Sequence, residues 1–451
     1  MNYVPGIRVL RVINKFQRIY AFGRGDGLRA QLVRGAVGVG GLKLLSVPLT
    51  LAVSILLARG LGPEGYGKYV FVMAVISLLA LPIGPGLGQL ITREVAKYHH
   101  GKDWSLIRGL LRRAHQWVLV GSVVMLLTIA GVAARQAEWR MDDRWALHLV
   151  AALMLPLLGL NAVRSSTLRG LRHVFYAQLP ELLARPCLHL VIAGTLLAVG
   201  MLNPATALAS QITATGLGFA IGAWLLWRRR PPEVVHARPE YRNREWGAAL
   251  LPFTLLVAIS TFNIQIGIVA VGWLSTDAEV AALRVALSGS LLVSMPLAII
   301  NQVIAPHITR AYRDNDTLRM ARLFRQSALT TLAIATPIAL PLIFFGKPIV
   351  GFAFGKAYLD SVSQPLAVLA VGQLINVAFG SVGLFLTMSG FHRLSLYGGM
   401  VGLTICVALM LALVPNLGAV GAAIAYAVAL AVVNISHAYY VGRKLRLKLF
   451  L

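Results

Sequence analysis

The stretch LLARGLGPEGYGKYVF, residues 56–71, places a cluster of glycines, a proline and three charged residues between two long apolar segments. Glycine permits backbone conformations that are closed to other residues, and proline fixes one backbone dihedral. The stretch therefore predicts a tight turn between two apolar helices. Arg59 and Glu64 lie close enough in sequence to form an ion pair, which would lower the cost of holding charge at a membrane edge.

Outside this turn the composition is that of a membrane protein. The chain has 451 residues, of which 57% are hydrophobic and only 13% charged, and its mean hydropathy is +0.73. Lipid favours an apolar exterior and requires backbone groups to be satisfied internally, so we expect an all-α, polytopic protein. The net charge of +26 does not indicate nucleic-acid binding, because the cations lie in short segments between apolar runs.

Apolar runs punctuated by glycine, proline and charge predict twelve transmembrane helices. They cover residues 32–58, 69–91, 114–133, 145–163, 177–199, 204–227, 248–274, 280–306, 326–346, 362–388, 394–414 and 417–441. Most of the 42 Lys and Arg residues fall in the N-terminal segment, in the loops after even-numbered spans and in the C-terminal tail. The positive-inside rule therefore predicts that both termini are cytoplasmic.

A weak internal repeat divides the spans into two pseudo-symmetric six-helix lobes around a central cavity. In it Leu61 corresponds to Leu274, and Glu64 to Asp277. We predict a basic amphipathic segment on an anionic membrane surface (1–30), a first lobe (31–227), a cytoplasmic linker (228–247), a second lobe (248–441) and a basic cytoplasmic tail (442–451).

The turn and its continuation to residue 98 also carry a recognisable motif. Its residues are Arg59, Gly62, Pro63, Glu64, Tyr66, Gly67 and, at the exit of the second span, Arg93 and Glu94. The motif resembles that of lipid-linked oligosaccharide flippases of the polysaccharide-export kind, in the multidrug/oligosaccharidyl-lipid/polysaccharide exporter superfamily. Residues 168–186 and 388–428 are similar to later parts of the same family's pattern.

The resemblance implies a non-enzymatic flippase of the inner (plasma) membrane that moves an undecaprenyl-pyrophosphate-linked oligosaccharide to the periplasmic leaflet by alternating access. It would serve cell-surface polysaccharide biosynthesis such as that of O-antigen and lipopolysaccharide. Its partners would be the lipid-linked oligosaccharide, membrane lipids and other polysaccharide-assembly proteins, and not nucleic acid. We expect no cofactor and no metal site, and the coupling ion, H⁺ or Na⁺, is left open.

A pyrophosphate head group cannot cross hydrocarbon unshielded, so cations inside the spans are candidate substrate-binding residues. Lys43, Arg185 and Arg284 lie within predicted spans, and Arg93 lies at the inner mouth of the second. Each has a plainer interpretation as well, which for Lys43 is pairing with a nearby carbonyl or asparagine. Arg185 follows Glu181 at i, i+4 and pairs with it in the simplest account; Arg284 is near enough to a span end to snorkel, and Arg93 is equally well an ordinary topology charge.

Amide side chains inside the spans are candidate contacts for sugar hydroxyl groups, with hydrogen bonding between helices as the competing interpretation. They are Asn263, Gln265, Asn301, Gln302, Gln373 and Asn376.

Two other functions are compatible with the composition. A cation-coupled multidrug exporter of the same superfamily would need buried carboxylates, whereas Glu181 is essentially the only acid within the spans. A membrane glycosyltransferase, acting as a polymerase or ligase, would need a sizeable outer loop, and the predicted outer loops are short.

Overall fold

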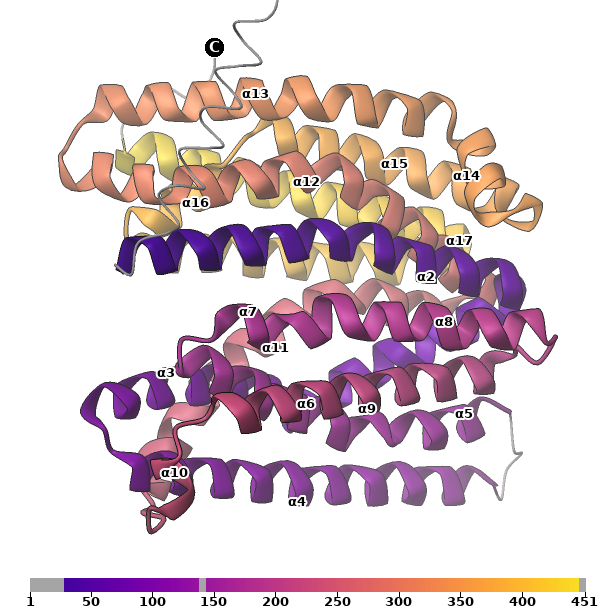
Figure 1. Ribbon diagram of the computed structural model, residues 1–451. Helices are drawn as coiled ribbons and strands as arrows, with labels where there is room; N and C mark the ends of the chain where they lie inside the picture. Colours follow the sequence, from indigo (N-terminus) through magenta and orange to yellow (C-terminus); the bar gives the residue numbers. More distant parts are fainter. Residues whose placement is uncertain (1–27, 138–142, 446–451) are drawn as a thin grey trace, which may run out of the picture.

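The computed structural model describes residues 28–137 and 143–445, and every regular element in those ranges is a helix (Figure 1). The predicted N-terminal amphipathic segment and the end of the C-terminal tail lie outside the described residues. The first half contains α2 (Leu28–Leu79), α3 (Pro85–Gly101), α4 (Trp104–Ala137), α5 (Asp143–Ala152), α6 (Met154–Gly170), α7 (Val174–Leu179), the π-helix η1 (Pro180–Ala184), α8 (Arg185–Ala198) and α9 (Pro204–Arg229).

A short helix, α10 (Glu233–His236), precedes the second half. That half contains α11 (Asn243–Leu274), α12 (Asp277–Arg313), α13 (Thr317–Phe344), α14 (Gly346–Phe354), the 3₁₀ turn η2 (Lys356–Tyr358), α15 (Leu359–Ala378), α16 (Val382–Met388) and α17 (His392–Leu445). Within the described ranges, ten helices are long and apolar enough to cross a membrane. The chain is thus an all-helical, multi-pass membrane protein.

Two of these ten helices are each a pair of helices joined across a kink. α2 has 52 residues and breaks at Gly62, whose φ is 70°, and α17 has 54 residues and breaks at Gly418, whose φ is 52°. Positive φ is readily available to glycine alone, because other residues carry a Cβ atom that clashes there. A straight helix of this length would be about 80 Å long, against a hydrocarbon thickness of about 30 Å. The turn predicted from residues 56–71 is therefore confirmed at Gly62.

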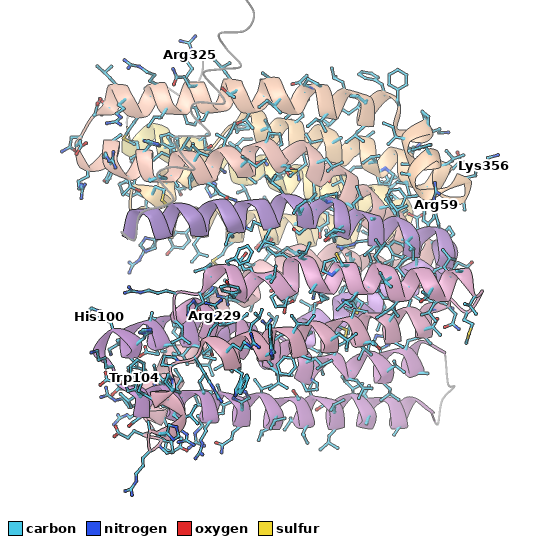
Figure 2. The ribbon with its side chains drawn as sticks, in the orientation of Figure 1. Arg59, His100, Trp104, Arg229, Arg325 and Lys356 are labelled. Carbon is cyan, nitrogen blue, oxygen red and sulfur yellow. The ribbon has the colours of Figure 1, made fainter. Side chains whose placement is uncertain are left out.

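The long helices run side by side, so that the bundle has two ends (Figure 1). Figure 2 labels Arg59 and Lys356 at one end and His100, Trp104 and Arg229 at the other. We refer to them as the Arg59 end and the Trp104 end. The helices α12 to α17 lie on one side of the bundle and α4 to α9 on the other, and α2 packs against members of both groups.

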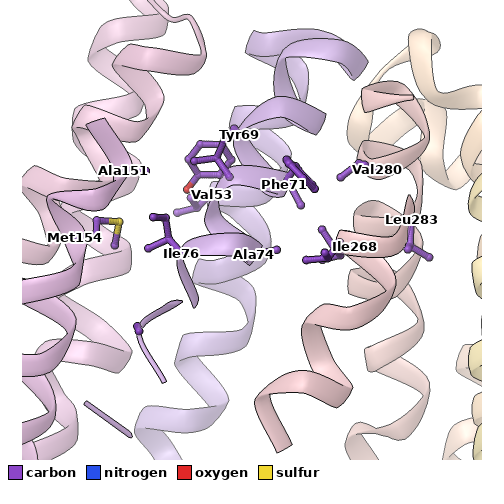
Figure 3. Packing of buried hydrophobic residues seen from close by; sticks show 14 of the residues in the cluster. Val53, Tyr69, Phe71, Ala74, Ile76, Ala151, Met154, Ile268, Val280 and Leu283 are labelled. Carbon is purple, nitrogen blue, oxygen red and sulfur yellow. The ribbon is translucent and has the colours of Figure 1, made fainter. Parts of the chain in front are cut away.

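The second stretch of α2 forms the packed seam between these groups (Figure 3). Ile76 faces Met154 of α6, and Phe71 faces Val280 of α12; all four side chains belong to one buried apolar cluster. Phe71 packs so closely on Gly272 of α11 that a Cβ atom there would lie 2.1 Å from its ring. Close packing of this kind fixes how the two halves approach each other.

Large apolar side chains are exposed on the outward face of the bundle. On α4 they include Leu119, Val123 and Leu127, whose side chains are all more than half exposed. An exposed aliphatic stripe along a helix of this length suits contact with lipid rather than water.

Candidate functional site

A cavity of about 610 Å³ lies between the two halves. Its walls come from both stretches of α2, from α8 and α9 of the first half, and from α11 and α12 of the second. In the first stretch of α2 the lining residue Leu57, near the Arg59 end, is 1% exposed, whereas Val47, farther from that end, is 37% exposed. The cavity lining on this stretch is therefore buried near the Arg59 end and more accessible away from it.

Two guanidinium groups line this cavity, one from each half of the chain. They belong to Arg185 on α8 and Arg284 on α12. The neutral polar lining includes Gln211, Gln265 and His189, and none of the described residues that line the cavity is an aspartate or glutamate. A cavity with fixed cations and no facing carboxylate favours an anionic occupant.

Arg185 is held by an ion-pair network behind the cavity wall. The Glu181 carboxylate lies 3.6 Å from the Arg185 guanidinium and 2.9 Å from that of Arg164. Arg164 is buried on α6, where its guanidinium also donates hydrogen bonds to Asn161 Oδ1 at 3.0 and 3.3 Å. One carboxylate thus serves two arginines, and the network keeps a net positive charge.

Arg164 was not among the residues predicted for the site. The predicted span ended at residue 163, which made Arg164 an ordinary loop cation, whereas α6 continues to Gly170. A usable signal was present, because Ser165, Ser166 and Thr167 extend the helix with small polar side chains and Asn161 lies one turn before Arg164. Glu181 lies in the π-helix η1, and such irregular turns are frequent at functional sites.

The other two predicted cations do not line the cavity. Lys43 is exposed on α2, one turn from Ser46, which does line it. Arg93 forms an ion pair of 2.6 Å with the neighbouring Glu94 and lies over the Phe253 ring at 5.1 Å. The structure thus brings Arg185 and Arg284 together at one cavity and leaves Lys43 and Arg93 outside its lining.

The predicted amides also separate into two groups. Gln265 lines the cavity. Several of the others form hydrogen bonds within the helix bundle. Asn263 donates to the Ile259 carbonyl, and Asn301 accepts from Ser381. Asn376 donates to Gln373 and accepts from Asn434 of α17. Gln302 is exposed and is not a lining residue.

The motif residues close the Arg59 end. Arg59 donates to the carbonyl oxygens of Ala353, at 2.8 Å, and Phe352, both on α14. The predicted ion pair between Arg59 and Glu64 is therefore wrong, because the guanidinium caps the last turn of α14 instead and Glu64 is exposed.

Tyr66 and Gly67 continue this closure. Tyr66 shares a 2.6 Å hydrogen bond with Ser54 and lines the cavity. A Cβ atom on Gly67 would lie 1.7 Å from the Asp277 carbonyl oxygen, so only glycine lets α2 approach α12 this closely. Gly62 provides the break before Pro63, and these two residues set the turn.

Comparison with known proteins identifies the class. Residues 32–312 match the family model described as "Polysaccharide biosynthesis protein". That match covers more than half of the chain, and the chain belongs to this family. A curated relative, "Probable low-salt glycan biosynthesis flippase Agl15" from Haloferax volcanii, is 19% identical over 395 residues, which are 87% of this chain and 79% of the relative.

Solved structures share the fold. An inward-facing multidrug resistance MATE family transporter of the MOP superfamily is similar with a TM-score of 0.74 and 16% identity, over 91% of this chain and 98% of that one. The lipid II flippase MurJ, in an inward closed conformation, has a TM-score of 0.68 and 13% identity, over 91% and 87% of the two chains. The family match confirms the resemblance to polysaccharide-export proteins, and these structures show that the chain shares the fold of transporters of the multidrug/oligosaccharidyl-lipid/polysaccharide exporter superfamily.

Proposed function

We propose that this protein is a flippase that moves an undecaprenyl-pyrophosphate-linked oligosaccharide from the cytoplasmic to the periplasmic leaflet of the inner membrane. The observation that carries the proposal is the cavity between the halves, in which Arg185 and Arg284 face the interior without a lining carboxylate. A pyrophosphate is a doubly charged anion that accepts charge-assisted hydrogen bonds from guanidinium groups. Gln265 and Gln211 offer hydrogen bonds to sugar hydroxyls in the same cavity.

The proposed architecture has twelve spans in two lobes of six, with both termini cytoplasmic. The ten membrane-spanning helices of the described ranges become twelve spans when the kinked helices α2 and α17 are each counted as two. This count is reasonable because each of these two helices is far longer than a bilayer is thick. In this arrangement residues 31–227 and 248–441 are the lobes, residues 228–247 are the cytoplasmic linker, and the Trp104 end is cytoplasmic. The many cations near that end support the orientation.

The cavity geometry supports transport by alternating access. Arg59 and Gly67 join the halves at one end, and the lining of the first stretch of α2 is more exposed away from that end, as expected for an inward-facing state. Substrate would enter from the cytoplasmic leaflet, and opening of the Arg59 contacts would release it on the other side. Prolines within spans, such as Pro296 and Pro337, interrupt the backbone ladder at places where helices can bend.

The family and its relatives support a glycan cargo. The relative from Haloferax volcanii is a probable flippase of glycan biosynthesis, and MurJ is a lipid II flippase. The substrate class, a lipid-linked oligosaccharide rather than an organic cation, fits the positive cavity. A multidrug exporter of cations would place a carboxylate in that lining instead.

Reconstitution tests the proposal. Proteoliposomes containing undecaprenyl-pyrophosphate-linked oligosaccharide would be assayed for the fraction of glycan that becomes accessible to an enzyme on the opposite face. Each lost charge-assisted contact is worth about 1.5 to 3 kcal/mol, so Arg185→Gln and Arg284→Gln should each slow translocation about ten-fold or more. Arg322→Gln and Arg325→Gln are matched controls, since both residues are exposed on α13 and outside the cavity.

Wild-type activity equal to that of empty liposomes would refute the flippase. Equal rates for the cavity variants and the α13 controls would refute the role of the two arginines. Chain elongation of the glycan by the purified protein would favour a glycosyltransferase instead.

A further inference from the structure

A second cavity, of about 630 Å³, lies at the Trp104 end and is separate from the transport cavity. It is enclosed by the first turns of α4, the end of α6, the end of α9 and the segment 230–241 that follows α9. Figure 1 shows α10 beside the start of α4, and Figure 2 labels Trp104 and Arg229 at this end of the bundle.

The walls of this cavity combine an apolar surface with cations. The apolar part includes Ile107 and Leu111 of α4, Leu171 after α6, and Val235 of α10. The charged part consists of Arg108, Arg112 and Arg230, and none of the described lining residues is acidic. A cavity lined by both apolar and cationic side chains suits an amphiphilic anion better than a small hydrated anion.

Two of the nearby arginines already have structural partners. Arg108 donates to the Ala237 carbonyl at 2.7 Å. Arg113, just outside the cavity, donates to Asn243 Oδ1 at 3.0 Å and lies over the Tyr241 ring at 5.3 Å. These contacts hold the segment after α9 against α4, and so they build the cavity.

Arg112 and Arg230 are different. Both are exposed cavity-lining residues, and neither guanidinium forms a hydrogen bond or ion pair with any residue in the described ranges. They come from different helices, α4 and the end of α9, yet they share one cavity. Two exposed guanidiniums without protein partners at one cavity are available to bind an anionic ligand.

Two exposed tryptophans on α9 lie near the cavity and indicate its position relative to the membrane surface. Trp224 and Trp227 of α9 are 49% and 63% exposed and lie within two turns of Arg230. Exposed tryptophans on a spanning helix are typical of the boundary between head groups and hydrocarbon. The two tryptophans therefore support a depth near that of phospholipid phosphate groups for Arg230.

We propose that this cavity is a binding site for an anionic glycerophospholipid. The lipid phosphate lies between Arg112 and Arg230, and an acyl chain covers the apolar floor formed by Ile107, Leu111 and Leu171. Because the walls include Val235 and Tyr241, the bound lipid fastens the segment between the two halves to the first half.

Native mass spectrometry and thermal denaturation of the purified full-length protein test the site. Phosphatidylglycerol would be titrated against phosphatidylcholine, and inorganic phosphate would be titrated separately. Wild type should bind phosphatidylglycerol preferentially and melt at a higher temperature in its presence. The double variant Arg112→Gln/Arg230→Gln should bind it about ten-fold or more weakly, because both unpaired cations are lost.

The matched control is Arg238→Gln/Arg244→Gln, which removes the same charge from exposed arginines at the same end that do not line the cavity. It should bind phosphatidylglycerol as wild type does. Val235→Glu is a second variant that keeps both arginines but adds a negative charge to the wall, and it should also weaken binding. Equal affinity of the double variant and the control would overturn the proposal, as would equal stabilisation by inorganic phosphate alone.

Discussion

Tyr358 donates a hydrogen bond of 2.9 Å to the carbonyl oxygen of Ala58, which joins the turn after α14 to the end of the first stretch of α2. Both residues are buried. Ala58 precedes Arg59, whose guanidinium binds the last carbonyls of α14. Two neighbouring residues of the first half are thus tied to one short segment of the second, and together they close the cavity at the Arg59 end.

Loss of this tie should favour opening at the Arg59 end. Tyr358→Phe removes one hydrogen bond, worth about 1 kcal/mol, and so should raise the open population about five-fold. A cysteine at Leu57, which is buried in the cavity wall, would report this through its rate of reaction with an impermeant maleimide, in a background lacking Cys187 and Cys406. Tyr397→Phe, at an exposed tyrosine on α17, is the control. Unchanged labelling in Tyr358→Phe would show that the tie does not hold the cavity shut.

Gly67 should not tolerate a side chain. A Cβ atom would lie 1.7 Å from the Asp277 carbonyl oxygen, and relieving that overlap should cost about 1 to 3 kcal/mol. Gly67→Ala is therefore expected to melt at a lower temperature than wild type. Gly131→Ala serves for comparison, since no heavy atom lies within 4 Å of its added Cβ atom. Identical melting of the two variants would contradict the close approach of α2 and α12.

Arg164 should contribute to stability through Glu181. Removing Arg164 takes away the shorter of the two ion pairs of Glu181 and leaves that carboxylate with Arg185 at 3.6 Å, at a cost of about 3 kcal/mol. We expect Arg164→Met to lower the free energy of unfolding by about that amount in the wild-type background. The same substitution should lower it less in a protein that already carries Glu181→Gln. A double-mutant cycle measures the coupling, which should exceed about 1 kcal/mol for groups 2.9 Å apart. A coupling near zero would remove Arg164 from the network.

Acid should destabilise the Trp104 end. Burial, with Arg172 and His100 nearby, lowers the pKa of His99 below 6.5, and burial with Arg229 and His99 nearby does the same to the pKa of His173. A lowered folded-state pKa means that, below about pH 6.5, the unfolded chain binds more protons than the folded one, so stability falls as the pH falls.

Melting temperatures measured between about pH 7.5 and 5.5 test this expectation, because histidines titrate in about this range. The double variant His99→Gln/His173→Gln should lose less stability than wild type on acidification. His392→Gln, at a histidine of α17 in the other half, should keep the wild-type dependence. A steeper loss in the double variant would reverse the sign of the argument.

The sequence by itself determined that this is an all-helical membrane protein with a sharp break near Gly62. Hydropathy and glycine chemistry are local properties, so composition and spacing suffice to predict them. The family resemblance could be recognised from the sequence for the same reason, because its motif residues lie within one short stretch of the chain. They are Arg59, Gly62, Pro63, Glu64, Tyr66 and Gly67.

Only the tertiary structure decided which cations share the cavity and which residues they bind. Arg185 and Arg284 meet there although about a hundred residues separate them, and Arg59 binds α14 rather than its neighbour Glu64. Arg164 is buried although its position suggested a loop. Partner choice depends on which helices pack together, and packing depends on contacts between distant segments that no local pattern encodes.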